Sequence, residues 1–261
     1  HLRDVELAVH PDHRRRGIGR ALLQRLVAAA GEKDDLVLFS ASNSRVPSGE
    51  AFAKRLGAKP GLNNRTSQVE LAAVDRAMVA EWSKIDPAGY RLAWVDTAFT
   101  PEELVPNVLV AYETMNTAPR EDLQIDDWKM TAELLRDFER TGEAAGRQRR
   151  LLLAIAEGTG ETAGYTEVAY DPRVPHLVHQ NGTAVVPAHR GHGIGKWVKA
   201  RMVERVLSEW PAARLIRTGN AYSNAPMLSI NDRLGFRAAF SVMVWQLPIA
   251  DARRYAGGRG L

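Results

Sequence analysis

The residues best suited to chemistry lie in a turn rich in glycine and basic side chains. The segment VVPAHRGHGIGKWVKARM, residues 185–202, has three glycines at alternate positions among Arg190, His192 and Lys196. Glycine lets backbone N–H groups approach a ligand closely, and the first turn of a helix adds unpaired N–H groups and partial positive charge. The β-branched run before the turn predicts a strand, and the amphipathic run after it predicts a helix. The segment therefore predicts a site for a phosphate or diphosphate group.

A second turn of the same kind occurs near the start of the chain. The segment LAVHPDHRRRGIGRALLQRL, residues 7–26, places Gly17 and Gly19 among four arginines, Arg14, Arg15, Arg16 and Arg20. Two common phosphate motifs do not fit the later copy. A dinucleotide fingerprint would need glycine in place of Lys196, and a P-loop would need serine or threonine in place of Trp197.

The elements around the two turns also occur twice in the same order. Arg14 and Arg190 are 176 residues apart, and Gly57 and Gly235 are 178 apart, which predicts a tandem repeat. The hydrophobic patterns of the first copy predict strands at 3–10, 35–42 and 66–72 and helices at 17–33 and 48–57. Those of the second predict strands at 176–187, 213–221 and 236–247 and helices at 193–210 and 225–235.

The second copy has additional predicted elements upstream of its turn. They are strands at 90–97, 149–157 and 163–170 and helices at 101–115 and 126–140. We therefore expect a first domain at 1–71 that lacks its opening strands, a linker helix at 72–89 and a complete second domain at 90–261. Because the sequence begins at His1 without methionine, we expect the natural product to be longer.

Composition narrows the class of protein. The chain is 45% hydrophobic and 25% charged, which is typical of soluble globular proteins. With no cysteine it has no disulfide, thiolate nucleophile or thiolate zinc site. No segment resembles a membrane span or a secretory signal, so we expect a cytoplasmic protein. A net charge of +4 is too small to indicate nucleic-acid binding by itself.

These motifs together resemble the GNAT acyltransferase superfamily. Its pattern Arg/Gln-x-x-Gly-x-Gly/Ala after the fourth strand is matched by Arg190, Gly193 and Gly195, and again by Arg14, Gly17 and Gly19. TGNAYSNAPMLSINDRLGF, residues 218–236, is similar to a second signature of the family, and residues 42–58 are its weaker echo. The order of motifs most resembles tandem acetyltransferases of actinobacteria, an architecture shared by mycothiol synthase. The resemblance implies an α/β (α+β) fold with a mixed, mostly antiparallel central sheet flanked by helices.

The resemblance also implies a reaction. The donor would be acetyl-CoA, and the acceptor would be a primary amine that attacks the thioester directly in a ternary complex. The implied cofactor-binding residues of the second domain are Ala184, Val185 and Val186 beside the pantetheine arm, Arg190, Gly191, His192, Gly193, Ile194, Gly195 and Lys196 around the pyrophosphate, and Asn220 or Asn224. Those of the first domain are Leu7, Val9, Arg14, Arg15, Gly17 and Gly19.

The catalytic groups are less clearly marked. Many family members protonate the leaving thiolate with a tyrosine where this chain has Asn231, so we consider Tyr222 as a substitute. The position of the family's glutamate base holds His179, whose ordinary pKa of about 6.5 suits a general base. Glu167 on the neighbouring strand is the alternative base. In the first domain the equivalent positions are Arg3 and Glu6. We expect that domain to be non-catalytic, because it lacks an acceptor-binding half.

Three classes of function remain open. The first is an amine N-acetyltransferase acting on a small molecule, and the second is a non-catalytic protein that binds or senses acyl-CoA. Nucleic-acid binding through the arginine turns ranks last, because it leaves the glycine spacing unexplained. We expect no metal, no membrane partner and no nucleic-acid partner, and a monomer or homodimer. The sequence does not specify the amine.

Overall fold

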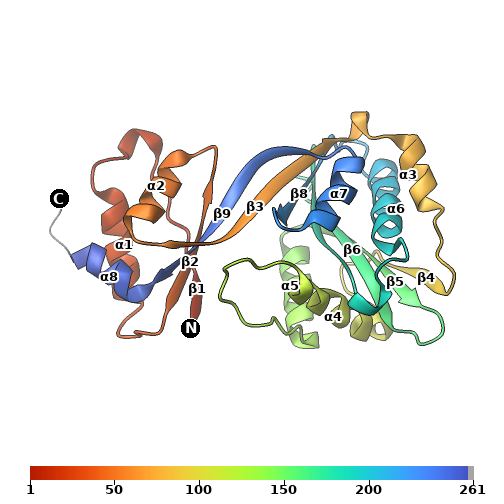
Figure 1. The fold of residues 1–261 in the computed structure, drawn as a ribbon, viewed down its shortest axis with the longest axis horizontal. Helices are drawn as coiled ribbons and strands as arrows, with labels where there is room; N and C mark the ends of the chain where they lie inside the picture. The colour runs from red at the N-terminus through yellow and green to blue at the C-terminus, as the bar shows by residue number, and fades with distance from the viewer. Residues whose placement is uncertain (258–261) are drawn as a thin grey trace. The chain divides into compact units, whose positions relative to one another are not determined.

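The computed structural model describes residues 1–257 of the chain, and its elements follow one another in the order that the two repeats predict (Figure 1). The strands are β1 Leu2–Asp4, β2 Val37–Asn43, β3 Lys59–Glu70, β4 Tyr90–Val95, β5 Gln148–Ala156, β6 Thr162–Tyr170, β7 Leu177–Val185, β8 Leu215–Ala221 and β9 Arg237–Pro248. The α-helices are α1 Ile18–Ala29, α2 Pro47–Arg55, α3 Arg76–Ser83, α4 Val105–Glu113, α5 Ala132–Ala144, α6 Ile194–Glu209, α7 Ala225–Arg233 and α8 Ile249–Gly257. Among the helices of the described residues, none has the length and apolar character needed to span a bilayer.

Several boundaries differ from the sequence-based prediction. β1 ends at Asp4 instead of continuing to residue 10. α5 begins six residues later than predicted, because the side chain of Thr131 accepts a hydrogen bond from the N–H of Leu134 and so caps the helix. The linker helix is only α3, which Asp75 caps through the N–H of Met78. α8 was not predicted.

The chain forms two compact units, and neither is continuous in sequence. Of the described residues, unit 1 contains 1–65, 120–125 and 240–257, and unit 2 contains 66–119 and 126–239. The units therefore differ from the sequential domains 1–71 and 90–261. The reason is strand pairing: the later part of β9 pairs with β2, from Asn43↔Val242 to Val37↔Pro248. The later part of β3 is the neighbour of β8 in unit 2.

Unit 1 is a small sheet covered by helices. β1 runs parallel to β2, and β9 runs antiparallel to β2. The helices α1 and α8 are in contact, and Gln24 Nε2 donates a 2.8 Å hydrogen bond to the carbonyl oxygen of Ala256. The buried core of this unit draws on both ends of the chain and includes Leu23, Leu38, Trp245, Leu247 and Ile249.

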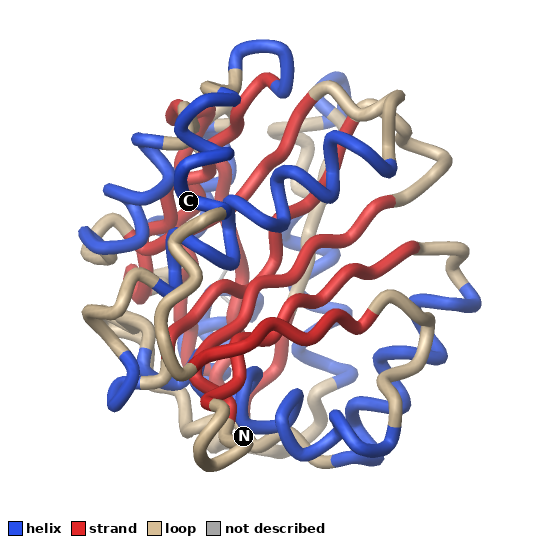
Figure 2. The backbone as a smooth tube through the Cα atoms, turned by 90° about the vertical axis from the view of Figure 1, so that its right-hand side faces the viewer, coloured by secondary structure: helices blue, strands red, loops and turns tan. Residues whose placement is uncertain are grey.

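Unit 2 has a mixed, mostly antiparallel sheet, as predicted. Its strand order is β3, β8, β7, β6, β5, β4, in which β7 and β8 are parallel and β4 to β7 are antiparallel. Alternate residues of β5 enter different cores: Leu152 and Ala154 pack with α3 and α6, whereas Leu151, Leu153 and Ile155 pack with α4 and α5. Helices therefore cover both faces of this sheet (Figures 1 and 2).

Candidate active site

A bulge in β7 lies where the sheet of unit 2 begins to open. The pairing of β6 with β7 moves from Val168↔Gln180 to Thr166↔Thr183, so β7 has an extra residue. The side chain of Gln180 stabilises the bulge, because its Nε2 donates to the carbonyl oxygen of Glu167 at 2.6 Å. Within the bulge, an added Cβ on Gly182 would lie 1.9 Å from the hydroxyl oxygen of Tyr165, so only glycine fits.

Past the bulge, β7 and β8 separate. Their pairing ends at His179↔Arg217, although β7 continues to Val185 and β8 to Ala221. Two diverging parallel strands leave backbone groups without strand partners. Some groups expected beside the pantetheine arm are nevertheless engaged: the N–H of Val186 donates to the Ala163 carbonyl, and the carbonyl of Val185 accepts from Arg190 Nε at 3.1 Å.

The glycine turn follows β7 directly and begins α6. Gly193 is the residue that precedes the helix and has a φ of 82°, and Gly191 has a φ of 87°, in the left-handed region that favours glycine. Arg190 braces the turn, because its Nη2 also donates to Thr117 Oγ1 at 2.9 Å. Within residues 1–257, the backbone N–H groups from Gly191 to Gly195 have no hydrogen-bond partner. Such a set of N–H groups at a helix start is suited to bind an anion.

Lys196 is among the residues predicted around the pyrophosphate, but its backbone N–H is already engaged. Its backbone N–H donates to the carbonyl oxygen of Gly193 at 3.0 Å and is therefore not available to a ligand. Its ammonium nitrogen lies 5.5 Å from the centre of the Trp82 ring, at cation–π distance.

Unit 1 repeats the geometry of the turn. Arg14 Nε donates to the carbonyl oxygen of Val9 at 3.1 Å, and Gly17 has a φ of 79° before α1. Arg15 occupies the position of Gly191 and is itself left-handed, with a φ of 62°. Across the described part of the chain, the N–H groups of residues 15–19 lack partners as well.

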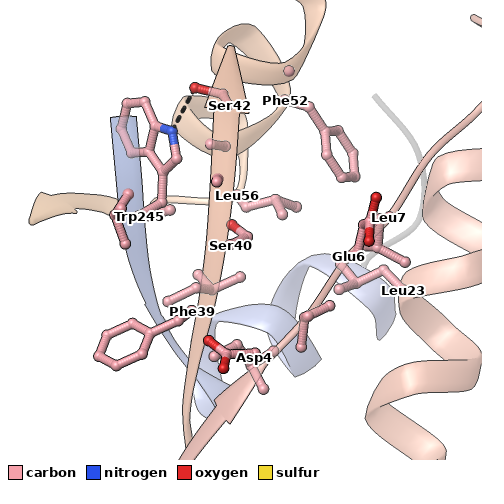
Figure 3. Close-up of a pocket in the computed structure, with 18 residues that line it drawn as sticks. Asp4, Glu6, Leu7, Leu23, Phe39, Ser40, Ser42, Phe52, Leu56 and Trp245 are labelled. Atoms are coloured by element: carbon pink, nitrogen blue, oxygen red, sulfur yellow. Dashed lines mark hydrogen bonds between the residues drawn. The ribbon is translucent and has the colours of Figure 1, made fainter. Parts of the chain in front are cut away.

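Unit 1 also contains a cavity of about 600 Å³ beside β2 (Figure 3). Leu7, Leu23, Phe52 and Leu56 are among its apolar lining residues, and Trp245 closes one side while donating to Ser42 Oγ at 2.8 Å. The carboxylates of Asp4 and Glu6 also lie at the cavity. Leu7 therefore lines a cavity of unit 1, and its role in cofactor binding stays a prediction.

His179 is the last residue of β7 that pairs with β8. Its side chain is exposed, and partial burial together with the charges of Arg217 and Arg147 lowers its pKa. A lowered pKa keeps the imidazole neutral near pH 7, which is the form that can accept a proton. The position therefore suits a general base beside the opening of the strands.

Glu167, the alternative base, lies in a buried polar network. Its two oxygens accept hydrogen bonds from the Tyr112 hydroxyl and from Asn181 Nδ2, the latter at 2.7 Å. Burial and the charge of Glu167 raise the pKa of Tyr112, so the phenol stays protonated as a donor. Tyr112 in turn accepts from Arg149 Nη1 at 2.9 Å. Glu167 is thus held by donors in a fixed orientation.

Glu139 supports this network from the opposite side. Its side chain is fully buried and accepts from Thr100 and from Arg149 Nη2, each of these bonds being 2.6–2.9 Å long. Burial opposes its ionisation, but the hydrogen bonds from Thr100 and Arg136 outweigh burial and lower its pKa. Arg149, Glu139 and Asn181 were not identified from the sequence. For Arg149 and Glu139 the only available signal was a charged side chain within a predicted strand or helix.

The remaining candidates lie around the carboxyl end of β8. Tyr222 is exposed, and Asn224 caps α7 by accepting from the N–H of Met227. Asn220 Oδ1 accepts from Asn231 Nδ2 at 2.8 Å, and Asn231 is fully buried. A search of the described residues finds no group of three or more histidine or acidic side chains that could hold a metal ion.

Comparison with known families accounts for both turns. A model described as "Acetyltransferase (GNAT) domain" matches residues 1–57, and one described as "Acetyltransferase (GNAT) family" matches residues 112–236. The chain belongs to the GNAT family and carries two GNAT domains in tandem, the first of them short. The GNAT family consists of acyltransferases, so membership points to acyl transfer. The actinobacterial type stays a prediction.

Solved structures agree with this assignment. A tandem GNAT protein from the clavulanic acid biosynthesis pathway, solved without AcCoA, is 29% identical, with 99% of this chain and 76% of that chain covered and a TM-score of 0.78. The fold is also that of a GCN5-related N-acetyltransferase from Sphaerobacter thermophilus, at 14% identity, 92% and 71% coverage and a TM-score of 0.60. Another, from Kribbella flavida, is 15% identical, with 89% and 75% covered and a TM-score of 0.55. No curated protein matches the chain.

Proposed function

We propose that unit 2 transfers an acetyl group from acetyl-CoA to a primary amine of a small molecule. The observation that carries this proposal is the row of unpartnered N–H groups from Gly191 to Gly195 beside two diverging parallel strands. A diphosphate fits the N–H groups, and an extended arm fits the opening between the strands. Membership of the GNAT family supports acyl transfer, and the similar tandem GNAT protein was solved without AcCoA, which names the donor for that protein.

Each candidate residue then has a definite task. When bound, acetyl-CoA supplies a thioester carbon to which the amine nitrogen bonds as the carbon–sulfur bond breaks. His179 takes the proton that the amine nitrogen loses, because its lowered pKa leaves it neutral. Tyr222, the substitute for the family's tyrosine at the position of Asn231, protonates the leaving sulfur. Glu167 orients the side chains that would contact the amine. Both of its oxygens accept hydrogen bonds, from Tyr112 and from Asn181.

We assign catalysis to unit 2 and not to unit 1. The residue of the first repeat that corresponds to His179 is Arg3, which stays protonated and cannot serve as a base. To unit 1, with its glycine turn and its cavity, we assign the binding of an acyl-CoA without turnover.

Two measurements test the proposal. Calorimetry with acetyl-CoA and with CoA measures binding, and a thiol-release assay over a panel of polyamines and aminoglycosides measures transfer. We expect uptake of the coenzyme and thiol release with at least one amine. If calorimetry detected no binding of acetyl-CoA or CoA, the proposal would be overturned.

The second candidate function is an acyl-CoA sensor. It is favoured by one observation: the position of the family's tyrosine holds Asn231, which is buried and hydrogen-bonded to other side chains. Coenzyme binding with no thiol release on any amine would favour the sensor over the transferase.

A further inference from the structure

α6 contains a lysine in the core of unit 2. Lys199 is only 1% exposed, and its Nζ has one hydrogen bond within residues 1–257, a 2.7 Å bond to Asn231 Oδ1. Its Nζ lies 5.3 Å from the centre of the Phe236 ring. Burial lowers the pKa of Lys199 to about 7, and no acidic group faces it from α7, β8 or its own helix among the described residues.

A lysine in this position is costly for stability. A buried amine without an acidic partner loses its hydration, and a methionine of similar length would fill the same space without that penalty. Packing therefore does not explain Lys199. Its one hydrogen bond is the feature that an apolar side chain could not reproduce.

That bond determines the direction of a chain of amides. Lys199 Nζ donates to Asn231 Oδ1, as an amine or an ammonium group can, so Asn231 turns its NH₂ group to the next residue. The NH₂ group of Asn231 donates to Asn220 Oδ1 at 2.8 Å. The oxygen of Asn220 is thereby used, and its own NH₂ group is left without a partner in the described chain and in contact with solvent.

Asn220 lies where a ligand would need such a donor. It is half-buried on the part of β8 that follows Arg217, the last residue paired with β7. We propose that Lys199 is a positioning residue: acting through Asn231, it holds the Asn220 amide with its NH₂ group outward, as the hydrogen-bond donor for a carbonyl oxygen of the acyl donor's pantetheine arm. This inference rests on the function proposed above for the same site.

Two variants change the direction of the amide chain in different ways. Lys199→Met removes the donor that orients Asn231, so both amides can turn over. Asn231→Asp keeps an acceptor for Lys199, but a carboxylate cannot donate, so Asn220 must turn its NH₂ group inward and its oxygen outward. Arg201→Met is the matched control, because Arg201 is an exposed cation of the same helix, paired with Glu204.

The first readout is affinity. Calorimetry with CoA should give a dissociation constant about fivefold weaker in Lys199→Met and about tenfold weaker in Asn231→Asp, the range expected for one lost neutral hydrogen bond. The control should bind as the unchanged chain does. Thermal unfolding separates this from a structural role, since Lys199→Met should melt no lower than the unchanged chain at pH 7. Equal affinities in all four chains, or a melting temperature of Lys199→Met that falls with its affinity, would overturn the inference.

The second readout needs no coenzyme. In ¹⁵N-edited spectra of the ligand-free chain, the side-chain NH₂ protons of Asn220 should exchange rapidly with water and those of Asn231 slowly. In Asn231→Asp the Asn220 protons should become slow. Slow Asn220 protons in the unchanged chain would contradict the inference. Absence of CoA binding with the expected exchange pattern would instead refute the proposed function and leave the amide direction established.

Discussion

His179 combines exposure, a lowered pKa and a position at the end of the β7–β8 pairing. Partial burial is the main cause that lowers the pKa of the imidazole, and the charges of Arg217 and Arg147 lower it further. A base must be neutral before it can accept a proton, so this environment extends the working range of His179 to lower pH. At the residue scale, the environment of His179 is therefore better suited to a base than that of Glu167.

Replacing His179 with glutamine should lower kcat/KM by about 100-fold, the usual contribution of a general base. The unchanged enzyme should lose activity only as the pH falls below the ordinary histidine pKa, and the variant should lose that limb of its pH profile. Steady-state rates from pH 5 to 9 with the best amine of the panel measure both effects. His176→Gln, an exposed histidine just before β7, is the control. A variant with an unchanged profile would exclude His179 as the base.

Lys199 predicts a dependence of stability on pH. Its pKa is about 7 in the folded chain and 10.5 in the unfolded chain, so between these values the unfolded chain binds the extra proton. The lysine therefore destabilises the fold increasingly as the pH falls from 10 toward 7. The gain in unfolding free energy from Lys199→Met should be larger at pH 6.5 than at pH 10 by about 4 kcal/mol. Urea unfolding at both pH values, with Arg201→Met as control, tests this; a gain independent of pH would show that Lys199 is not desolvated.

The residues of the turn could be predicted from the sequence, but those of the polar network could not. Gly193 and Arg190 act through local backbone geometry, which spacing alone specifies. Lys199 and Arg149 depend on which side chains α7, β5 and α5 bring together, and no local pattern records that.

At the scale of elements, capping and bulges explain where the predicted boundaries failed. The helix predicted from residue 126 starts only where Thr131 offers its hydroxyl oxygen to an N–H group. The divergence of β7 from β8 begins beside one extra residue in β7, near Gly182, which periodicity does not reveal. Hydrophobic patterns did predict the order of the elements in both repeats.

Gly193→Ala tests the turn as an element. A left-handed φ of 82° costs an L-residue about 1–2 kcal/mol, and the new Cβ would lie 3.2 Å from Ile85 Cγ2. We expect the turn to shift, the N–H groups to lose their common direction and the affinity for CoA to fall about tenfold. Calorimetry measures this. Gly142→Ala is the control, because Gly142 lies inside α5 with open space around its Cα, and it should bind normally with slightly higher stability. Unchanged affinity in Gly193→Ala would count against the turn as the diphosphate site.

At the scale of the whole molecule, the two units are assembled from segments far apart in the sequence. β2 and β9 pair across about 200 residues, a contact that no short motif encodes. Each sequence repeat ends in a long strand, β3 in the first and β9 in the second, and each strand has residues in both units. The sequence therefore predicted two repeats correctly, but the repeats are not the compact units.

This arrangement predicts that a substitution near the end of the chain loosens its beginning. Trp245 is 3% exposed in the core of unit 1 and donates to Ser42, so Trp245→Ala should cost that unit about 3–5 kcal/mol. Hydrogen exchange followed by mass spectrometry should then rise in residues 1–65 and stay unchanged in 126–239. Met202→Ala, in the core of unit 2, is the matched control and should give the opposite pattern. If Trp245→Ala raised exchange in 126–239 instead, β9 would belong with its own repeat and the division into units would be wrong.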